Sequence, residues 1–203
     1  MLSFQTVVPH TLELLTELMD VPLFSEMRLV GGTALALQYG HRQSVDLDFF
    51  GKLSADVSEI HDVLANIGPH TIYTNTQNIK IFEVNGVKVD FVNYKYDWID
   101  DIVTEGNLRL ASPKDIAAMK VNAIEGRGSR KDFIDIYFLL KHFTLNEILE
   151  FYKQKYPEHS VFRALMSLNY FDDAEQQGMP KMLVPFDWNE LKEKFKREVD
   201  KLT

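Results

Sequence analysis

The residues best suited to chemistry are two aspartates, Asp46 and Asp48, separated by one residue in an apolar stretch. Strand side chains alternate between faces, so both carboxylates would share one face while Leu47 and Phe49 point into the core. Adjacent carboxylates repel each other unless a cation lies between them, and Mg²⁺ prefers carboxylate oxygens together with substrate phosphates. A solvated turn is the alternative, but such a turn would not need apolar residues packed around its acids. We therefore predict that the pair binds Mg²⁺.

A glycine pair precedes the aspartates at the start of a predicted helix. Gly31, Gly32 and Thr33 follow an apolar strand predicted at Met27–Val30 and lead into a helix at Thr33–Tyr39. A glycine backbone can approach a phosphate closely, and a helix N-terminus offers free N–H groups and positive potential. Either feature alone is weak evidence. Together with the aspartates, the turn indicates phosphoryl or nucleotidyl transfer.

A third carboxylate, that of Asp90, lies in a well-alternating strand predicted at Val87–Val92. Lys88 shares its face, because the two positions differ by two residues. An acid in the middle of a sheet is costly without a partner, which leaves two interpretations. In one, the face is solvated and Lys88 contacts Asp90. In the other, Asp90 is a third carboxylate beside Asp46 and Asp48.

Two further polar features remain ambiguous. The basic segment Gly126–Lys131 is either an ordinary loop between helices or a contact for phosphate. His41 has no second histidine at a metal-ligand spacing, so we interpret it as structural.

The remaining pattern predicts a β-rich first half and a helical second half, an α+β order. Besides the strand at Asp46–Phe50, strands are predicted at Thr71–Thr74, Ile79–Val84 and Asn107–Ala111, with a hairpin turn at Asn85-Gly86. Helices are predicted at Pro9–Met19, from a Ser54 cap to Ile67, at Pro113–Glu125, at Lys131–Leu140, after Thr144, after Ser160 and from Asp187. We expect loops at Tyr94–Asp101 and Asp172–Pro180.

The bulk composition describes an ordinary soluble protein. The 203 residues suffice for one sizeable domain, or for a compact domain with a helical extension. Cysteine is absent, which excludes disulfides and thiolate metal sites and fits a reducing cytoplasm. We find no signal peptide or membrane span, and expect no membrane partner. The formal net charge of −8 argues against a broad non-specific coat of nucleic acid, but leaves room for a local RNA site.

In order and spacing, the motifs between Leu29 and Leu140 resemble the AbiEii/AbiGii-type toxin family within the polymerase-β-like nucleotidyltransferase superfamily. The resemblance rests on Gly31-Gly32-Thr33, Arg42-x-Ser44-x-Asp46-x-Asp48-Phe49-Phe50, Lys88-x-Asp90, Pro113-Lys114-Asp115-Ile116 with Lys120, and Arg130-Lys131-Asp132-Phe133-x-Asp135-Ile136. The family's usual Gly-Ser pair is Gly32-Thr33 here, which keeps the hydroxyl. The C-terminal helices match nothing diagnostic.

The resemblance implies a nucleotidyltransferase-like mixed sheet with flanking helices over residues 1–111, and a helical region over 112–203 that completes the cleft. It implies that Asp46, Asp48 and Asp90 bind Mg²⁺ and converge within a few ångströms, and that Lys120 is catalytic. We expect Lys120 to lie open in the cleft with little role in folding, although a surface lysine remains the alternative. The implied nucleotide-binding residues are Gly31, Gly32, Thr33, Arg42, Ser44, Lys88 and Asp132, the last paired with Arg130 or Lys120.

Three functional hypotheses follow, and the resemblance favours the first. In it, the protein is a toxin that transfers a nucleotide from a nucleoside triphosphate to RNA, with tRNA as the expected acceptor and a cognate antitoxin as partner. The second is a small-molecule nucleotidyltransferase of the antibiotic-modifying kind. The third is a non-catalytic binding protein on the same fold, against which the three intact aspartates weigh. The basic segment slightly favours RNA over a small molecule.

Overall fold

The computed structural model describes residues 1–203 and divides into two compact units. Unit 1 contains Met1–Lys95 and Ile102–Ala111, and unit 2 contains Tyr96–Asp101 and Ser112–Thr203. The main boundary therefore falls between Ala111 and Ser112. The segment Tyr96–Asp101, which precedes that boundary in the chain, packs with the second unit.

Unit 1 is built on a mixed seven-stranded sheet with the strand order β3-β4-β5-β2-β1-β7-β6. The strands are β1 (Met27–Leu29), β2 (Leu47–Gly51), β3 (His70–Asn75), β4 (Ile79–Val84), β5 (Val87–Asn93), β6 (Val103–Glu105) and β7 (Leu108–Leu110). The pairs β2–β5 and β1–β7 are parallel, and the other neighbours are antiparallel. The two strands that carry Asp48 and Asp90 are thus neighbours in the interior of the sheet.

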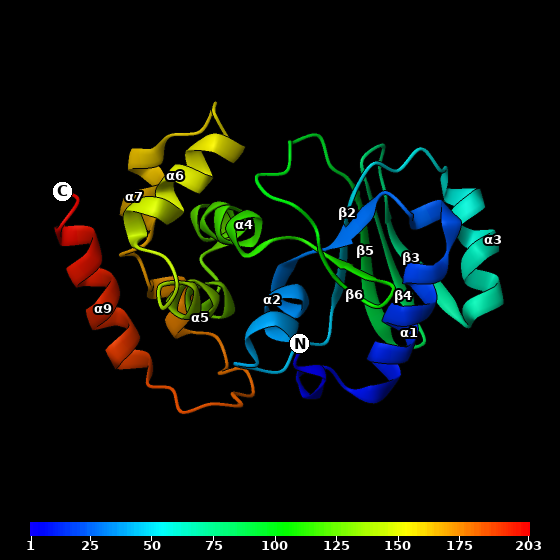
Figure 1. Cartoon of the computed structure of the whole chain (residues 1–203), viewed down its shortest axis with the longest axis horizontal. Helices are drawn as coiled ribbons and strands as arrows, with labels where there is room; N and C mark the ends of the chain where they lie inside the picture. The colour runs from blue at the N-terminus through cyan, green and yellow to red at the C-terminus, as the bar shows by residue number, and fades with distance from the viewer. The chain divides into compact units, whose positions relative to one another are not determined.

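Helices flank this sheet and form the core of unit 1 with it. The helical segments are η1 (Phe4–Thr6), α1 (Pro9–Asp20), η2 (Pro22–Phe24), α2 (Gly31–Tyr39) and α3 (Val57–Ile67). Figure 1 shows α1 and α3 on the same side of the strands. Phe24 stacks on Phe91 at a ring-centroid distance of 4.4 Å, and Phe49 stacks on Phe91 at 5.5 Å. The alternating apolar residues of β2 and β5 therefore anchor the strands and leave their opposite face to the acids.

Unit 2 is entirely helical, with α4 (Pro113–Arg127) packed against α5 (Arg130–Leu139), α6 (Leu145–Lys155) and α7 (Val161–Ser167). It ends with α8 (Asp172–Glu175) and α9 (Trp188–Asp200). Phe133 of α5 lies in an aromatic cluster with Phe171, Trp188 and Phe195. None of the helices combines the length with the apolar composition that crossing a membrane requires.

The predicted α+β order is confirmed, and so is the hairpin between β4 and β5. Its turn residues Asn85 and Gly86 have φ values of 51° and 77°, as a type I′ turn requires. The short strand β6 and the four-residue helix α8 were not predicted. Neither element carries a periodic sequence signal of its own. Strand β6 pairs only with β7, at the edge of the sheet.

Three boundaries differ from the predictions for local reasons. Helix α2 begins at Gly31, so the glycines form its first turn instead of preceding it. Strand β2 begins at Leu47, which leaves Asp46 just outside the strand. Asp56 caps α3 in place of Ser54, because its side chain accepts from the backbone of Ser58 and Glu59 and completes a capping box.

Candidate active site

Asp48 and Asp90 lie side by side on the sheet of unit 1, on the face opposite to the buried Phe49 and Phe91. Strands β2 and β5 are parallel, and their register pairs Asp48 with Asp90. Directly paired residues of neighbouring strands point to the same face, with the strands about 4.8 Å apart. Their strand neighbours Leu47, Phe49 and Phe91 are fully buried on the other face. The predicted placement of Asp90 beside Asp48 is therefore confirmed by the register.

Asp46 precedes β2, so strand register does not by itself place it beside the other two acids. No set of three or more histidine, aspartate or glutamate side chains is arranged to hold a metal ion. The backbone carbonyl of Asp46 accepts the hydroxyl of Thr33. The convergence of all three carboxylates stays a prediction, because strand register places only Asp48 and Asp90 beside each other.

The carboxylate of Asp90 is only half satisfied. Its Oδ2 accepts from the ammonium of Lys88 at 2.7 Å, whereas its Oδ1 is buried and has no hydrogen-bond partner. Buried carboxylate oxygens are nearly always paired, and an ionised carboxylate can only accept. The Lys88 contact of the first interpretation therefore exists, and Asp90 also lies beside Asp48 as the second interpretation requires. The donor set at this position fits a divalent metal.

The glycine turn is shaped by close approach of two side chains. Gly31 has φ +67°, and a Cβ added there would run into the carboxylate of Asp48. A Cβ added to Gly32 would run into the guanidinium of Arg42 and lie 3.3 Å from the hydroxyl of Ser44. The N-cap residue of α2, Val30, makes no side-chain cap. The glycine turn and the Asp48 carboxylate therefore lie together.

Thr33 and Ser44 hold the loop that carries Asp46. The fully buried hydroxyl of Thr33 contacts Ser44 Oγ at 2.8 Å and donates to the carbonyl of Asp46. Arg42 is buried as well, and its Nη1 donates to the carbonyl of Gln43 at 3.0 Å. These side chains shape the loop, so Thr33 can offer phosphate only its backbone N–H. His41 is fully buried, in keeping with a structural role.

Lys120 lies inside unit 2 in a buried ionic cluster. Its ammonium is 2.8 Å from Asp132 Oδ1 and 2.6 Å from Asp135 Oδ2, and both carboxylates are fully buried. Only 5% of the lysine side chain is exposed. The expectation of an open lysine and the alternative of a surface lysine are therefore both wrong. An ammonium held between two buried carboxylates links α4 to α5 through two ion pairs.

Asp132 is the centre of that cluster. It also accepts from Arg127 Nε at 2.9 Å and from the hydroxyl of Ser129. Burial alone would raise the pKa of Asp132, but the charges of Lys120 and Arg127 outweigh it and lower the pKa to about 2. The predicted pairing of Asp132 with Lys120 is confirmed. The alternative with Arg130 is wrong, because Arg130 pairs with Glu175.

A second buried ion pair, between Asp115 and Lys155, was missed by the sequence analysis. Both side chains are fully buried, with Lys155 Nζ 2.8 Å from Asp115 Oδ1. The same carboxylate accepts from the backbone N–H groups of Ile99 and Asp100, while Lys155 donates to the carbonyl of Asp97. This contact, which we call the loop anchor, fixes Tyr96–Asp101 onto unit 2. The spacing of Ser112 and Asp115 indicated only a helix cap.

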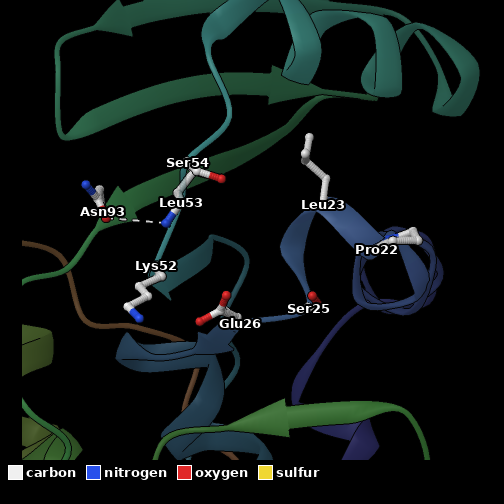
Figure 2. Close-up of a pocket in the computed structure, with 8 residues that line it drawn as sticks. All are labelled: Pro22, Leu23, Ser25, Glu26, Lys52, Leu53, Ser54 and Asn93. Carbon is white, nitrogen blue, oxygen red and sulfur yellow. Dashed lines mark hydrogen bonds between the residues drawn. The ribbon is translucent and has the colours of Figure 1, made fainter.

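A cavity of about 440 Å³ opens elsewhere in unit 1. Figure 2 shows it between the end of β2, the start of β1 and η2, with Glu26 and Lys52 among its lining residues. Its charged residues are exposed. Since β2 runs from Asp48 toward this cavity and ends at Gly51, the cavity lies beyond the opposite end of the strand from the acids.

Comparison with known proteins agrees with this geometry. The model of the family described as "Nucleotidyl transferase AbiEii toxin, Type IV TA system" matches residues 13–100, a range that includes the glycine turn and all three aspartates. An uncharacterised protein of Aquifex aeolicus (strain VF5) is 35% identical over 196 residues, covering 92% of this chain and 93% of the relative. The similarity therefore extends over both units.

Two solved structures share the fold. JHP933 from Helicobacter pylori aligns with a TM-score of 0.55 at 20% identity, covering 97% of this chain and 93% of that protein. MenT4, a nucleotidyltransferase toxin from Mycobacterium tuberculosis H37Rv, aligns with a TM-score of 0.58 at 12% identity, covering 93% and 81%. A mixed sheet with two acids on neighbouring strands beside a glycine turn is thus a nucleotidyltransferase fold. Residues 13–100 of the chain form a nucleotidyltransferase domain of the AbiEii type.

Proposed function

We propose that this enzyme transfers a nucleotide from a Mg²⁺-bound nucleoside triphosphate to a hydroxyl group of RNA, with tRNA as the acceptor. The single observation that carries the proposal is the pairing of Asp48 with Asp90 across β2 and β5, beside the glycine turn. The buried, unpartnered Oδ1 of Asp90 supports a cation at this position. Asp46, two residues before Asp48, is the proposed third ligand.

Each residue near the acids has a distinct proposed task. When bound, the metal would supply positive charge that stabilises the attacking and leaving oxygens of an in-line displacement. The backbone N–H groups of Gly32 and Thr33 would hold the triphosphate at the start of α2. Arg42 and Ser44 would keep the Asp46 loop in place. Asp90 would also help to deprotonate or orient the acceptor hydroxyl.

Lys120 and Asp132 are proposed to serve the same reaction. We propose that the ammonium of Lys120 neutralises triphosphate charge and that Asp132 holds this ammonium in place. Because Asp132 and Asp135 already neutralise it, the lysine would have to give up part of an ion pair in order to act. Its contribution to catalysis is therefore separable from its structural role only by experiments that measure both.

Labelling distinguishes the acceptor classes. The enzyme is incubated with each of the four labelled nucleoside triphosphates, Mg²⁺ and total tRNA, and in parallel with aminoglycosides as small acceptors. We expect label to enter tRNA from one preferred triphosphate, and no label with Asp48→Asn. Label in the small acceptor but not in tRNA would favour the antibiotic-modifying alternative. No transfer to either, with the protein folded, would favour a non-catalytic binding protein.

A cognate antitoxin is the proposed partner. The family's description as the toxin of a type IV system supports this proposal. We expect expression of the wild-type chain to arrest growth, and expression of Asp48→Asn to be tolerated. Co-expression of the adjacent reading frame should restore growth. Equal toxicity of both chains would contradict a toxic activity that depends on nucleotide transfer.

A further inference from the structure

A row of polar side chains crosses the face of the sheet that carries the acids. We call Tyr73, Glu83, Lys88 and Asp90 the polar row. Strand register pairs Glu83 of β4 with Lys88 of β5, and pairs Asp90 of β5 with Asp48 of β2. Lys88 and Asp90 are two residues apart on one strand and share its face. The row therefore runs from the edge strand to the proposed cation site.

Lys88 has two carboxylates within its reach. Its ammonium pairs with Asp90 at 2.7 Å, and Glu83 lies directly across from it on the neighbouring strand, with Cβ atoms about 5 Å apart. The hydroxyl of Tyr73 donates to Glu83 Oε2 at 2.9 Å, which holds that carboxylate on the same face. The Lys88 side chain is 45% exposed, whereas that of Asp90 is 16% exposed. The lysine can thus move while the aspartate stays in place.

An ammonium and a divalent cation compete for the same carboxylate. With the lysine on Asp90, one of the two paired aspartates is neutralised, so their mutual repulsion is reduced. A cation that binds Asp90 repels the ammonium beside it. Glu83 lies opposite Lys88 on the neighbouring strand, so its carboxylate would pair with the displaced ammonium. The contact of Glu83 with Tyr73 leaves its Oε1 for this second ion pair.

We propose that Lys88 takes the place of the cation at Asp90 in the metal-free enzyme and moves to Glu83 when a divalent cation binds. Glu83 is then a positioning residue that sets the cation affinity through Lys88, and Tyr73 supports it. This inference rests on the proposed function, because it requires that Asp48 and Asp90 form the cation site.

The test measures cation affinity without turnover. Mn²⁺ is titrated into the full-length protein without nucleotide, and free Mn²⁺ is followed by electron paramagnetic resonance. We expect Lys88→Met to tighten Mn²⁺ binding about fivefold, because no ammonium has to leave, and Glu83→Gln to weaken binding by a similar factor. In the Lys88→Met background, Glu83→Gln should change the affinity less than twofold, since its effect passes through the lysine.

Two matched variants control for charge and for folding. Lys52→Met removes a positive charge from unit 1 beyond the end of β2, where Figure 2 shows it at the rim of the cavity, and it should leave the Mn²⁺ affinity within twofold of wild type. Lys88→Gln repeats the test if Lys88→Met fails to fold. The melting temperature of each metal-free variant is recorded. Removal of Lys88 should lower this temperature, because Asp90 and Asp48 then repel each other without a neighbouring positive charge.

The outcomes separate this inference from the proposed function. An unchanged affinity in both Lys88 variants, or an equal effect of Glu83→Gln in both backgrounds, overturns the displacement of Lys88 while leaving the cation site intact. A wild-type protein that does not bind Mn²⁺, or an Asp48→Asn variant that binds it as tightly as wild type, overturns the cation site and this inference with it.

Discussion

Gly31 holds a position that no other residue type can occupy without disturbing a carboxylate. Its φ of +67° lies in the left-handed region, and its missing Cβ leaves the space into which Asp48 extends. Two separate requirements thus meet at one residue. The backbone needs a glycine, and the acid needs the room.

Gly31→Ala should therefore impair activity more than stability. Backbone strain at a positive φ costs about 1 kcal/mol, whereas a displaced Asp48 carboxylate should reduce transfer on the order of 10²-fold. Urea unfolding measures the first effect, and nucleotide transfer or Mn²⁺ titration measures the second.

Gly106→Ala is the matched control. Gly106 has a similar φ of +61°, but no atom lies within 4 Å of its added Cβ. The strain should be the same, and the transfer rate should remain within twofold of wild type. If both alanines reduce transfer equally, the defect comes from general strain and not from Asp48.

Lys120→Ala should destabilise the protein strongly. The substitution would leave two fully buried carboxylates with much of their positive charge removed, which costs about 3–5 kcal/mol for a broken buried pair. Urea unfolding at pH 7 measures this loss. Lys114→Ala, earlier on the same helix, removes a lysine that is 40% exposed and should cost less than about 1 kcal/mol.

A catalytic role for Lys120 predicts an additional effect. Transfer by Lys120→Ala, measured under conditions in which the variant is shown to be folded, should remain reduced on the order of 10²-fold. Full activity of the folded variant would assign the lysine to structure alone.

At the scale of elements, the junction of α4 and α5 is a pH-sensitive contact. The pKa of Asp132 is lowered from its usual 3.8 to about 2, so the native state favours the ionised form. The stabilisation that ionised Asp132 adds to the folded protein is fully present above pH 4. It is lost as the pH falls through 2, because protonation of Asp132 breaks its pairs with Lys120 and Arg127. The sign follows from the unfolded chain binding more protons in this range.

The free energy of unfolding should therefore fall by about 2 kcal/mol more in wild type than in Asp132→Asn between pH 4 and pH 2. Urea unfolding at several pH values measures the difference. Asp62→Asn, at an exposed position of α3, should follow the wild-type curve. Parallel curves for wild type and Asp132→Asn would contradict the lowered pKa.

Breaking the loop anchor at Lys155 of α6 should destabilise the protein strongly. Lys155→Met would leave Asp115 fully buried without its cation and should cost about 3 kcal/mol or more. Lys153→Met, on an exposed position of the same helix, should cost less than about 0.5 kcal/mol. Hydrogen exchange at the amides of Ile99 and Asp100 should accelerate only in the first variant, since both donate to Asp115.

Sequence patterns predicted the elements and the acids because both depend on local rules. Alternation in β2 and β5 placed Asp48 and Asp90 away from the apolar core, and Asn85-Gly86 fixed the hairpin. The ionic contacts of Lys120 and Lys155 were harder to predict. They join residues 12 and 40 positions apart, and no periodic pattern distinguishes a buried lysine from an exposed one on a helix.

At the scale of the whole molecule, charge limits the way in which RNA can be bound. The formal net charge is −8, and the basic segment Gly126–Lys131 is partly engaged, with Arg127 on Asp132 and Arg130 on Glu175. A broad contact with a phosphate backbone is therefore disfavoured, and recognition of the proposed RNA acceptor would depend on a few local contacts.

The salt dependence of the reaction should accordingly be shallow. A plot of log kcat/KM for tRNA against log salt concentration should have a slope of about −2 or smaller in magnitude, since each neutralised phosphate contributes about −0.9. The transfer rate at several potassium chloride concentrations measures it. A slope steeper than about −4 would indicate an extended basic surface.

The strand order predicts how the arrangement of the two carboxylates is lost on heating. Strands β2 and β5 are both interior, so the backbone on each side of Asp48 and Asp90 is held by a neighbouring strand. Opening either strand means breaking two ladders at once, and such segments exchange their amide hydrogens only through global unfolding. The spacing of the two carboxylates should therefore persist until the sheet itself melts. Loss of cation binding and loss of secondary structure should then occur at one temperature, without an earlier inactivated state.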